Sequence, residues 1–100
     1  MEVIITKENK EVIACLKGRL DTPASLEIAK DMESLKADAS GTVILDCGEM
    51  SYISSSGLRL FLALRKAAAE KGGKIIIRNI CDDVRSVFMM TGFLNLFDIQ

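Results

Sequence analysis

Two hydrophobic runs near the start of this 100-residue chain have the composition of strands. The segments Val3–Thr6 and Glu11–Gly18 are rich in β-branched residues, and the polar segment KENK lies between them. β-Branched residues favour strands, and a short polar segment between two such runs is typical of a hairpin turn. The sequence therefore predicts that the chain opens as an antiparallel hairpin.

The next segment has the three-to-four-residue spacing of a helix. Its apolar positions at i, i+4 and i+7 are Ile28, Met32 and Leu35. Thr22 is a suitable N-cap, with Pro23 at the first helical position, and the pair Ser40-Gly41 is a suitable end. The pattern predicts one amphipathic helix of about three to four turns.

Strand and helix patterns then alternate to the end of the chain. Thr42–Cys47 is apolar up to Asp46, which predicts a buried strand that ends at this acid. Leu58–Lys71 is rich in strong helix formers and stops at a glycine pair, which predicts a second helix. The remaining predicted elements are a buried strand over Lys74–Asn79, a helix capped by Asp82 and ended by Gly92, and a short edge strand over Leu96–Ile99.

The predicted order is β-β-α-β-α-β-α-β, which places the chain in the α/β class. Alternating strands and helices require right-handed crossovers and a largely parallel sheet, to which the opening hairpin adds an antiparallel edge. The length suits one domain, covering residues 1–100. Function in such sheets usually lies at the carboxyl ends of the strands, and three consecutive serines are expected there.

Composition and charge exclude several classes of function. The chain has 13 basic and 14 acidic residues without a block of one sign, so we expect no direct nucleic acid partner. No apolar run approaches the length of a membrane span, so we expect no membrane insertion and a cytoplasmic location. Histidine is absent, and the three cysteines are far apart without a CxxC motif, which predicts buried, reduced thiols and no metal or cofactor. These cysteines are Cys15, Cys47 and Cys81.

The serines Ser54, Ser55 and Ser56 directly precede Gly57 and the second helix. One of them can act as an N-cap, but capping does not explain three hydroxyls. Without histidine, and without SxxK or GxSxG spacing, a nucleophilic serine is not expected, so we predict no catalytic residue and no enzyme activity. An exposed hydroxyl at a helix N-terminus is instead well suited to phosphorylation, because the helix dipole tolerates the added negative charge.

Several segments together resemble the STAS domain, the fold of bacterial anti-sigma factor antagonists that also occurs in sulphate transporter tails. The matching stretches are GRLDTPAS, VILDC, YISSSGLRLF and MMTGFLNLFDI, and the resemblance extends from about Val3 to Ile99. It implies a STAS-like mixed, mostly parallel sheet with helices packed mainly on one face. It also implies a protein that binds an anti-sigma factor with serine kinase activity and so frees a sigma factor. A phosphatase is a further implied partner.

The resemblance also assigns roles to individual residues. Ser56, just before the glycine, matches the residue that the partner kinase phosphorylates, with Ser55 or Ser54 as alternatives. The family usually has aspartate where this chain has Ser54. Asp21 matches the acid of the family's G-x-L-D segment and is expected near the serine turn, either as a neighbour of the first helix cap or as a residue that positions the acceptor hydroxyl.

The second predicted helix has a wider apolar arc than one sheet face requires. Leu58 and Leu62 lie on its flank, which either packs on a neighbouring helix or stays exposed for a partner. We expect Met89 and Met90, near the end of the third predicted helix, to fill the core and its flank. The predicted partner-binding residues are Asp21, Ser54, Ser55, Gly57, Leu58 and Leu62.

Two other functions stay open. The first is a STAS subunit of a membrane lipid or ion transport complex that acts without phosphorylation, which the missing aspartate would permit. The second is a small phosphotransfer enzyme with a cysteine as phospho-acceptor. This second function is disfavoured because no cysteine lies in a glycine-rich or basic turn.

Overall fold

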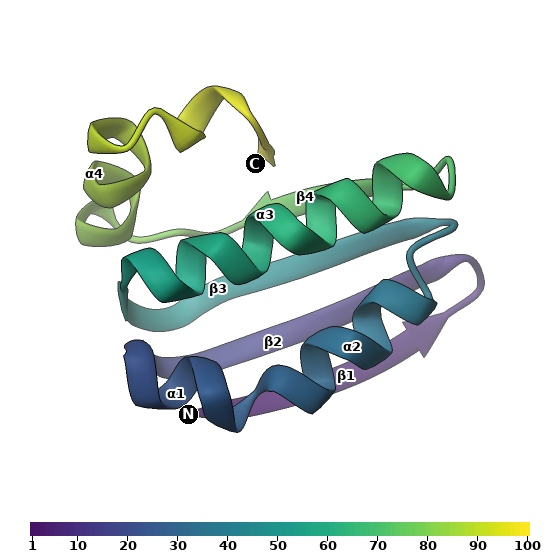
Figure 1. Ribbon diagram of the computed structural model, residues 1–100, viewed down its shortest axis with the longest axis horizontal. Helices are drawn as coiled ribbons and strands as arrows, with labels where there is room; N and C mark the ends of the chain where they lie inside the picture. The colour runs from purple at the N-terminus through teal and green to yellow at the C-terminus, as the bar shows by residue number, and fades with distance from the viewer.

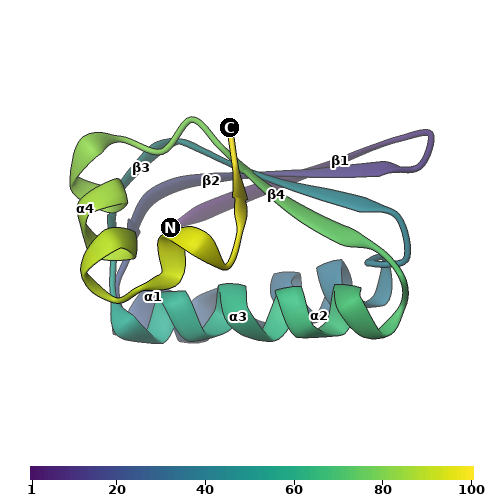
Figure 2. The same cartoon turned by 90° about the horizontal axis from the view of Figure 1, so that it is seen from above.

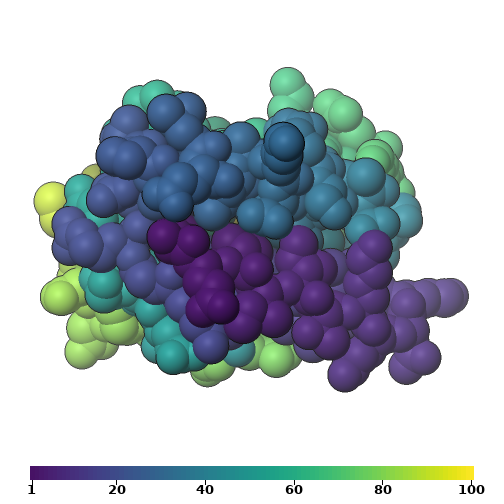
Figure 3. Space-filling view, turned by 90° about the horizontal axis from the view of Figure 1, so that it is seen from below, coloured from purple at the N-terminus to yellow at the C-terminus, as the bar shows by residue number.

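The first two strands form the predicted hairpin. In the computed structural model, which describes residues 1–100, β1 (Glu2–Glu8) pairs antiparallel with β2 (Glu11–Leu20). β1 is the outer strand of the sheet, and the hairpin turn projects beyond the rest of the molecule (Figures 1 and 3). The prediction of an antiparallel opening is confirmed.

The remaining strands are added in chain order to form a five-stranded sheet. Its order is β1-β2-β3-β4-β5, with β3 (Thr42–Ile53), β4 (Lys74–Arg78) and β5 (Asp98–Ile99). Every pairing after the hairpin is parallel. The predicted mixed, mostly parallel sheet is therefore confirmed, and the carboxyl ends of β2, β3 and β4 point toward the same edge.

Three helices cover one face of this sheet. α1 (Thr22–Glu27), α2 (Ala29–Ala37) and α3 (Ser55–Glu70) lie side by side beneath the strands in Figure 2. α4 (Asp82–Met90) lies instead across the end of the sheet, and the 3-10 helix η1 (Phe93–Asn95) leads from it to β5. None of these helices combines the length and apolar character that a membrane span requires.

The core lies between the sheet and the three helices. Alternate residues of β2 are buried on the helix side, as expected for the period of two in a strand. The largest fully buried side chains of the core cluster belong to the strands and to all the helices that face them. They include Leu16, Leu20, Ile28, Met32, Leu35, Ile53, Leu58, Phe61 and Phe88.

The prediction for the first helix is wrong in two details, because the observed helix is divided and has a different N-cap. It is divided at Ile28, whose dihedral angles (φ −94°, ψ 8°) depart from the helix although its N–H still donates to Ala24 O at 3.0 Å. Ile28 is buried in the core, so the break between the two helices lies beneath the sheet and not in an exposed loop. The N-cap is Asp21 and not Thr22, because the carboxylate accepts a hydrogen bond from Ala24 N–H at 3.0 Å.

The third strand is longer than predicted. Asp46 is the last residue that pairs with β4, opposite Arg78, but β3 continues to Ile53. Beyond Asp46 the strand pairs only with β2, across two register shifts. β2 is long enough to supply backbone partners for this second half. The acid therefore marks where β4 separates from β3, and the strand itself carries on to the serine turn.

The start of α4 differs from expectation as well. Its N-cap is Cys81, without a side-chain capping bond, where Asp82 was expected. Cys81 is exposed and Cys15 is half-buried, so the prediction of three buried thiols is correct only for Cys47. Cys81 lies at the start of α4, where its thiol reaches Met50 O of β3 at 3.6 Å but the residue stays exposed.

The two methionines at the end of α4 are also on the surface. Met89 is 61% exposed and Met90 is 86% exposed, which corrects the expectation that they fill the core and its flank. Only one side of α4 faces the sheet, and Val84 and Phe88 occupy that side. The methionines lie one and two residues past Phe88 and point away from it.

Candidate functional site

The serine turn joins β3 to α3 at the carboxyl edge of the sheet. Ile53, the last residue of β3, pairs with Leu20, the last residue of β2. Directly beyond this pair, Ser54 N–H donates to Leu20 O at 2.9 Å. The turn that follows β3 is therefore fixed beside the junction of β2 and α1, as Figure 1 shows.

The three serines have different environments. The hydroxyl oxygen of Ser54 accepts a hydrogen bond from Gly57 N–H at 3.2 Å, so Ser54 is the N-cap of α3. Ser55 is exposed and Ser56 is half-buried. The structure thus assigns the capping role to one hydroxyl and leaves two hydroxyls in the first turn of the helix.

Ser56 lies next to a residue that sequence reasoning did not select. Its Oγ is 3.4 Å from Oγ1 of Thr22, at the start of α1. Either hydroxyl can donate in this contact. A signal for Thr22 was present in the sequence, since it directly follows Asp21 in the segment that resembles the family. From the sequence alone, the position of Thr22 before Pro23 indicates only a helix cap.

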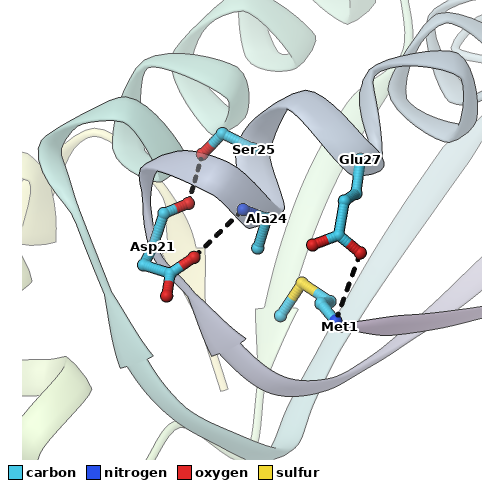
Figure 4. Close-up of polar contacts among 5 residues, drawn as sticks. All are labelled: Met1, Asp21, Ala24, Ser25 and Glu27. Atoms are coloured by element: carbon cyan, nitrogen blue, oxygen red, sulfur yellow. Dashed lines mark hydrogen bonds and ion pairs between the residues drawn. The ribbon is translucent and has the colours of Figure 1, made fainter.

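Asp21 reaches the same edge of the sheet and stabilises the start of α1. Its carboxylate accepts from Ala24 N–H, and its backbone carbonyl accepts from the Ser25 hydroxyl at 3.0 Å (Figure 4). The carboxylate therefore faces the α1 backbone. Asp21 orients the first turn of α1, and Thr22, the next residue, contacts Ser56. The N-terminal ammonium of Met1 lies 3.7 Å from Glu27 Oε2, and this pair, which is also drawn in Figure 4, joins the start of β1 to the end of α1.

Gly57 faces the protein's own core. A Cβ at this position would lie 2.7 Å from Leu20 Cγ and 2.9 Å from Ile53 Cγ1, closer than such contacts normally occur. The sequence suggested that Gly57 allows a partner to approach closely. The approach that the structure shows is instead that of α3 onto β2 and β3.

The flank of α3 that carries Leu58 and Leu62 is largely covered by the protein itself. It was one of two predictions that this flank stays exposed for a partner. Leu58 is only 2% exposed and belongs to the core, so the expectation that its side chain is left for a partner is wrong. Leu62 is half-buried. The reason is that α1 and α2 pack beside α3 and cover the flank that sequence periodicity left open.

The surface around the serines lies outside the clefts of the molecule. The N-terminus of α3 carries the partial positive charge of a helix start, which favours an anion nearby. Clefts of the surface, the largest of about 500 Å³ between the hairpin turn and the end of α2, are lined by other residues. No group of three or more potential metal ligands occurs in the structure. A surface of this shape suits contact with another protein better than enclosure of a small molecule.

Comparison with protein families gives a match over nearly the whole chain. The model of the STAS domain matches residues 3–100. The chain is 29% identical over 99 residues to the Bordetella bronchiseptica protein named anti-sigma factor antagonist BtrV, covering 99% of this chain and 85% of the relative.

Solved structures share the fold at lower identity. An anti-sigma factor antagonist structure from Thermotoga maritima has a TM-score of 0.87 at 17% identity, covering 97% of this chain and 84% of that one. Unphosphorylated SpoIIAA, a Bacillus cell fate determinant, has a TM-score of 0.81 at 22% identity, covering 99% and 88%. At these identities the two likenesses show the fold alone.

Proposed function

Because the chain belongs to the STAS domain family, we propose that it is an anti-sigma factor antagonist that phosphorylation switches off. It binds an anti-sigma factor with serine kinase activity in the cytoplasm and thereby frees a sigma factor. In this role the protein acts as a binding module and not as an enzyme, and a phosphatase restores the active form. The names of its relatives support this proposal.

The observation that carries the proposal is the placement of Ser56. Ser54 is occupied as the helix cap, whereas Ser56 lies in the first turn of α3 with its hydroxyl beside that of Thr22. A phosphoryl group there would lie at the positive end of the α3 dipole, and Thr22 could donate a hydrogen bond to it. Ser55 is the alternative acceptor because it is the most exposed of the three.

The switch is electrostatic and local. The unmodified turn docks on the anti-sigma factor with Ser54, Ser55, the neighbouring Asp21 and the half-buried side chain of Leu62. Phosphorylation adds a charge of about −2, which must lose water if the interface is to close. Asp21, which directly follows β2, and Glu49, which lies in β3, add repulsion. A change of a few kcal/mol is enough to dissociate a micromolar complex.

Because Gly57 and Leu58 are buried, we assign them a different role from the predicted contact with the partner. Both were expected to touch the partner, but both lie inside the domain. We propose that they support the interface from beneath by holding α3 against β2 and β3. Their substitution would then affect binding through the position of the serine turn.

Intact mass spectrometry tests this function. The wild-type chain is incubated with ATP and the serine kinase anti-sigma factor of the same organism, and should gain about 80 Da, the mass of one phosphoryl group. Ser56→Ala should keep its fold and lose the mass gain, while Ser55→Ala, the matched control, should be labelled normally. Loss of labelling in the control alone would move the site to Ser55.

Measuring the affinity for the same kinase tests whether a negative charge at Ser56 weakens binding, which is a separate question from whether Ser56 is phosphorylated. Ser56→Ala should bind like the wild type, and Ser56→Asp should bind more weakly, since a carboxylate mimics part of the phosphate charge. A wild-type chain that neither binds nor is labelled would contradict the proposal and favour a transport-complex subunit that acts without phosphorylation.

A further inference from the structure

A cation and an aromatic ring are stacked on the sheet next to the serine turn. The guanidinium carbon of Arg19 lies 4.5 Å from the centroid of the Tyr52 ring. The two residues are direct neighbours across β2 and β3. Both are exposed, whereas the next residues, Leu20 and Ile53, are buried beneath the helices. Successive residues of a strand point to opposite faces, so the stacked pair lies on the face that no helix covers.

Arg19 has no anionic partner within the chain. Lys17, the other basic residue at the end of β2, pairs with Glu49 at 3.3 Å. Asp21, the nearest acid after Arg19, directs its carboxylate to Ala24 N–H. None of the ion pairs of the structure includes Arg19. The guanidinium is therefore held in place by an aromatic ring while its five N–H donors stay available.

The stacked pair is connected directly to the candidate site. Arg19 precedes Leu20, whose carbonyl accepts the hydrogen bond from Ser54 N–H. Tyr52 is two residues before Ser54 on β3. A protein that covers the serine turn from the edge of the sheet would therefore meet this guanidinium at the margin of the same surface.

We propose that Arg19, positioned by Tyr52, is a docking contact for a carboxylate group of the anti-sigma factor partner, an inference that rests on the proposed function. A guanidinium binds a carboxylate through two parallel hydrogen bonds. The aromatic ring limits the motion of the long side chain before binding, so less conformational freedom is lost in the complex. Arginine and tyrosine are also among the residues that most often dominate interface energies.

Calorimetric titration of the purified serine kinase anti-sigma factor with variants of this chain tests the contact. Arg19→Gln should weaken binding by about tenfold, a typical loss for a charged interface pair. Tyr52→Leu should weaken binding less, and Tyr52→Phe should bind like the wild type because the ring face remains. The matched control is Arg65→Gln, which removes an exposed arginine of α3 about two and a half turns beyond Ser56. It should not change affinity.

Salt and stability measurements complete the test. The difference between wild type and Arg19→Gln should shrink at high ionic strength, because an ion pair at the margin of an interface is screened. Thermal melting should show that Arg19→Gln folds normally, and Arg19→Lys provides a second variant that keeps the charge without the two parallel bonds.

The outcomes distinguish this inference from the function on which it rests. A wild-type chain that fails to bind the kinase would overturn both. A wild-type chain that binds, together with a folded Arg19→Gln variant of equal affinity, would overturn only the docking contact. An equal loss in Arg65→Gln would also overturn it, because the effect would then reflect net charge and not the stacked arginine.

Discussion

Ser56 and Thr22 are 34 positions apart in the sequence, yet their hydroxyl oxygens lie 3.4 Å from each other. The contact joins the first turn of α3 to the first turn of α1. It places a potential hydrogen-bond donor next to the residue where we propose that negative charge appears.

A double-mutant cycle can measure this relationship without any partner. Thr22→Val should have little effect on the stability of the wild type, because the contact between neutral hydroxyls is long and exposed. In the Ser56→Asp background, where the threonine hydroxyl can donate to a carboxylate, the same substitution should cost about 0.5–1 kcal/mol more. Chemical denaturation of the four proteins gives the coupling energy. Equal effects in both backgrounds would show that Thr22 does not respond to charge at Ser56.

The packing of Gly57 leads to a second prediction. Gly57→Ala should destabilise the fold by about 1–3 kcal/mol, because the new methyl group overlaps Leu20 and Ile53. Leu20→Ala removes one of the overlapping side chains. The cost of Gly57→Ala should therefore be smaller in a Leu20→Ala background than in the wild type. Denaturant unfolding measures both differences, and additive effects would refute the steric explanation.

The flank of α3 offers a paired test of burial. Leu58→Glu should unfold the domain, because a carboxylate placed at a position that is 2% exposed has neither water nor a partner. Leu62→Glu should leave a folded protein, since the half-buried side chain can turn its charge to solvent. Circular dichroism during heating distinguishes the two. A folded Leu58→Glu variant with wild-type stability would contradict the packing of α1 against α3.

Cys47 should make the stability depend on pH in the alkaline range. Burial raises the pKa of its thiol from the ordinary value of 9.0 to about 12. Between these values the unfolded chain releases the proton while the folded chain keeps it. This contribution to stability is therefore complete below pH 9 and falls as pH rises toward 12, by about 1.4 kcal/mol per pH unit.

Comparing the pH slope of wild type with that of Cys47→Ala isolates this group, because the two proteins differ only in this side chain. The variant should have the shallower slope, and equal slopes would show that the thiol is not buried in its neutral form. Alkylation provides a second measurement. Exposed Cys81 should react with a maleimide in the folded protein, whereas Cys47 should react only after unfolding.

The main features of the fold follow from local patterns in the sequence. The β-branched runs, the helical spacing of Ile28, Met32 and Leu35, and the alternation after Thr42 predict the elements and the parallel sheet. The errors lie where long-range contacts decide the structure. The second half of β3 depends on pairing with β2, and no local pattern after Asp46 indicates that partner. The cap at Asp21 differs from the predicted one by a single residue.

The candidate site was predictable in part for the same reason. Ser54 as a cap follows from its position before a helix, and the resemblance indicates Ser56. The burial of Leu58 depends on how α1 packs beside α3, which one helix's periodicity cannot reveal. The contact between Ser56 and Thr22, and the stacking of Arg19 on Tyr52, require the register of β2 against β3. Sequence reasoning could not supply that register, because two shifts interrupt it.

The serine turn is anchored at three points, and this limits how much it can move when it is phosphorylated. The backbone of Ser54 is bonded to β2, its hydroxyl closes the first turn of α3, and Gly57 is packed against two core side chains. A turn held on three sides has little freedom to refold when a phosphoryl group arrives. Under the proposed function, no slow rearrangement stands between modification and release. The rates of the kinase and the phosphatase would then set the rate of the cell's response. The inactive state would last only as long as the phosphoryl group stays on the serine.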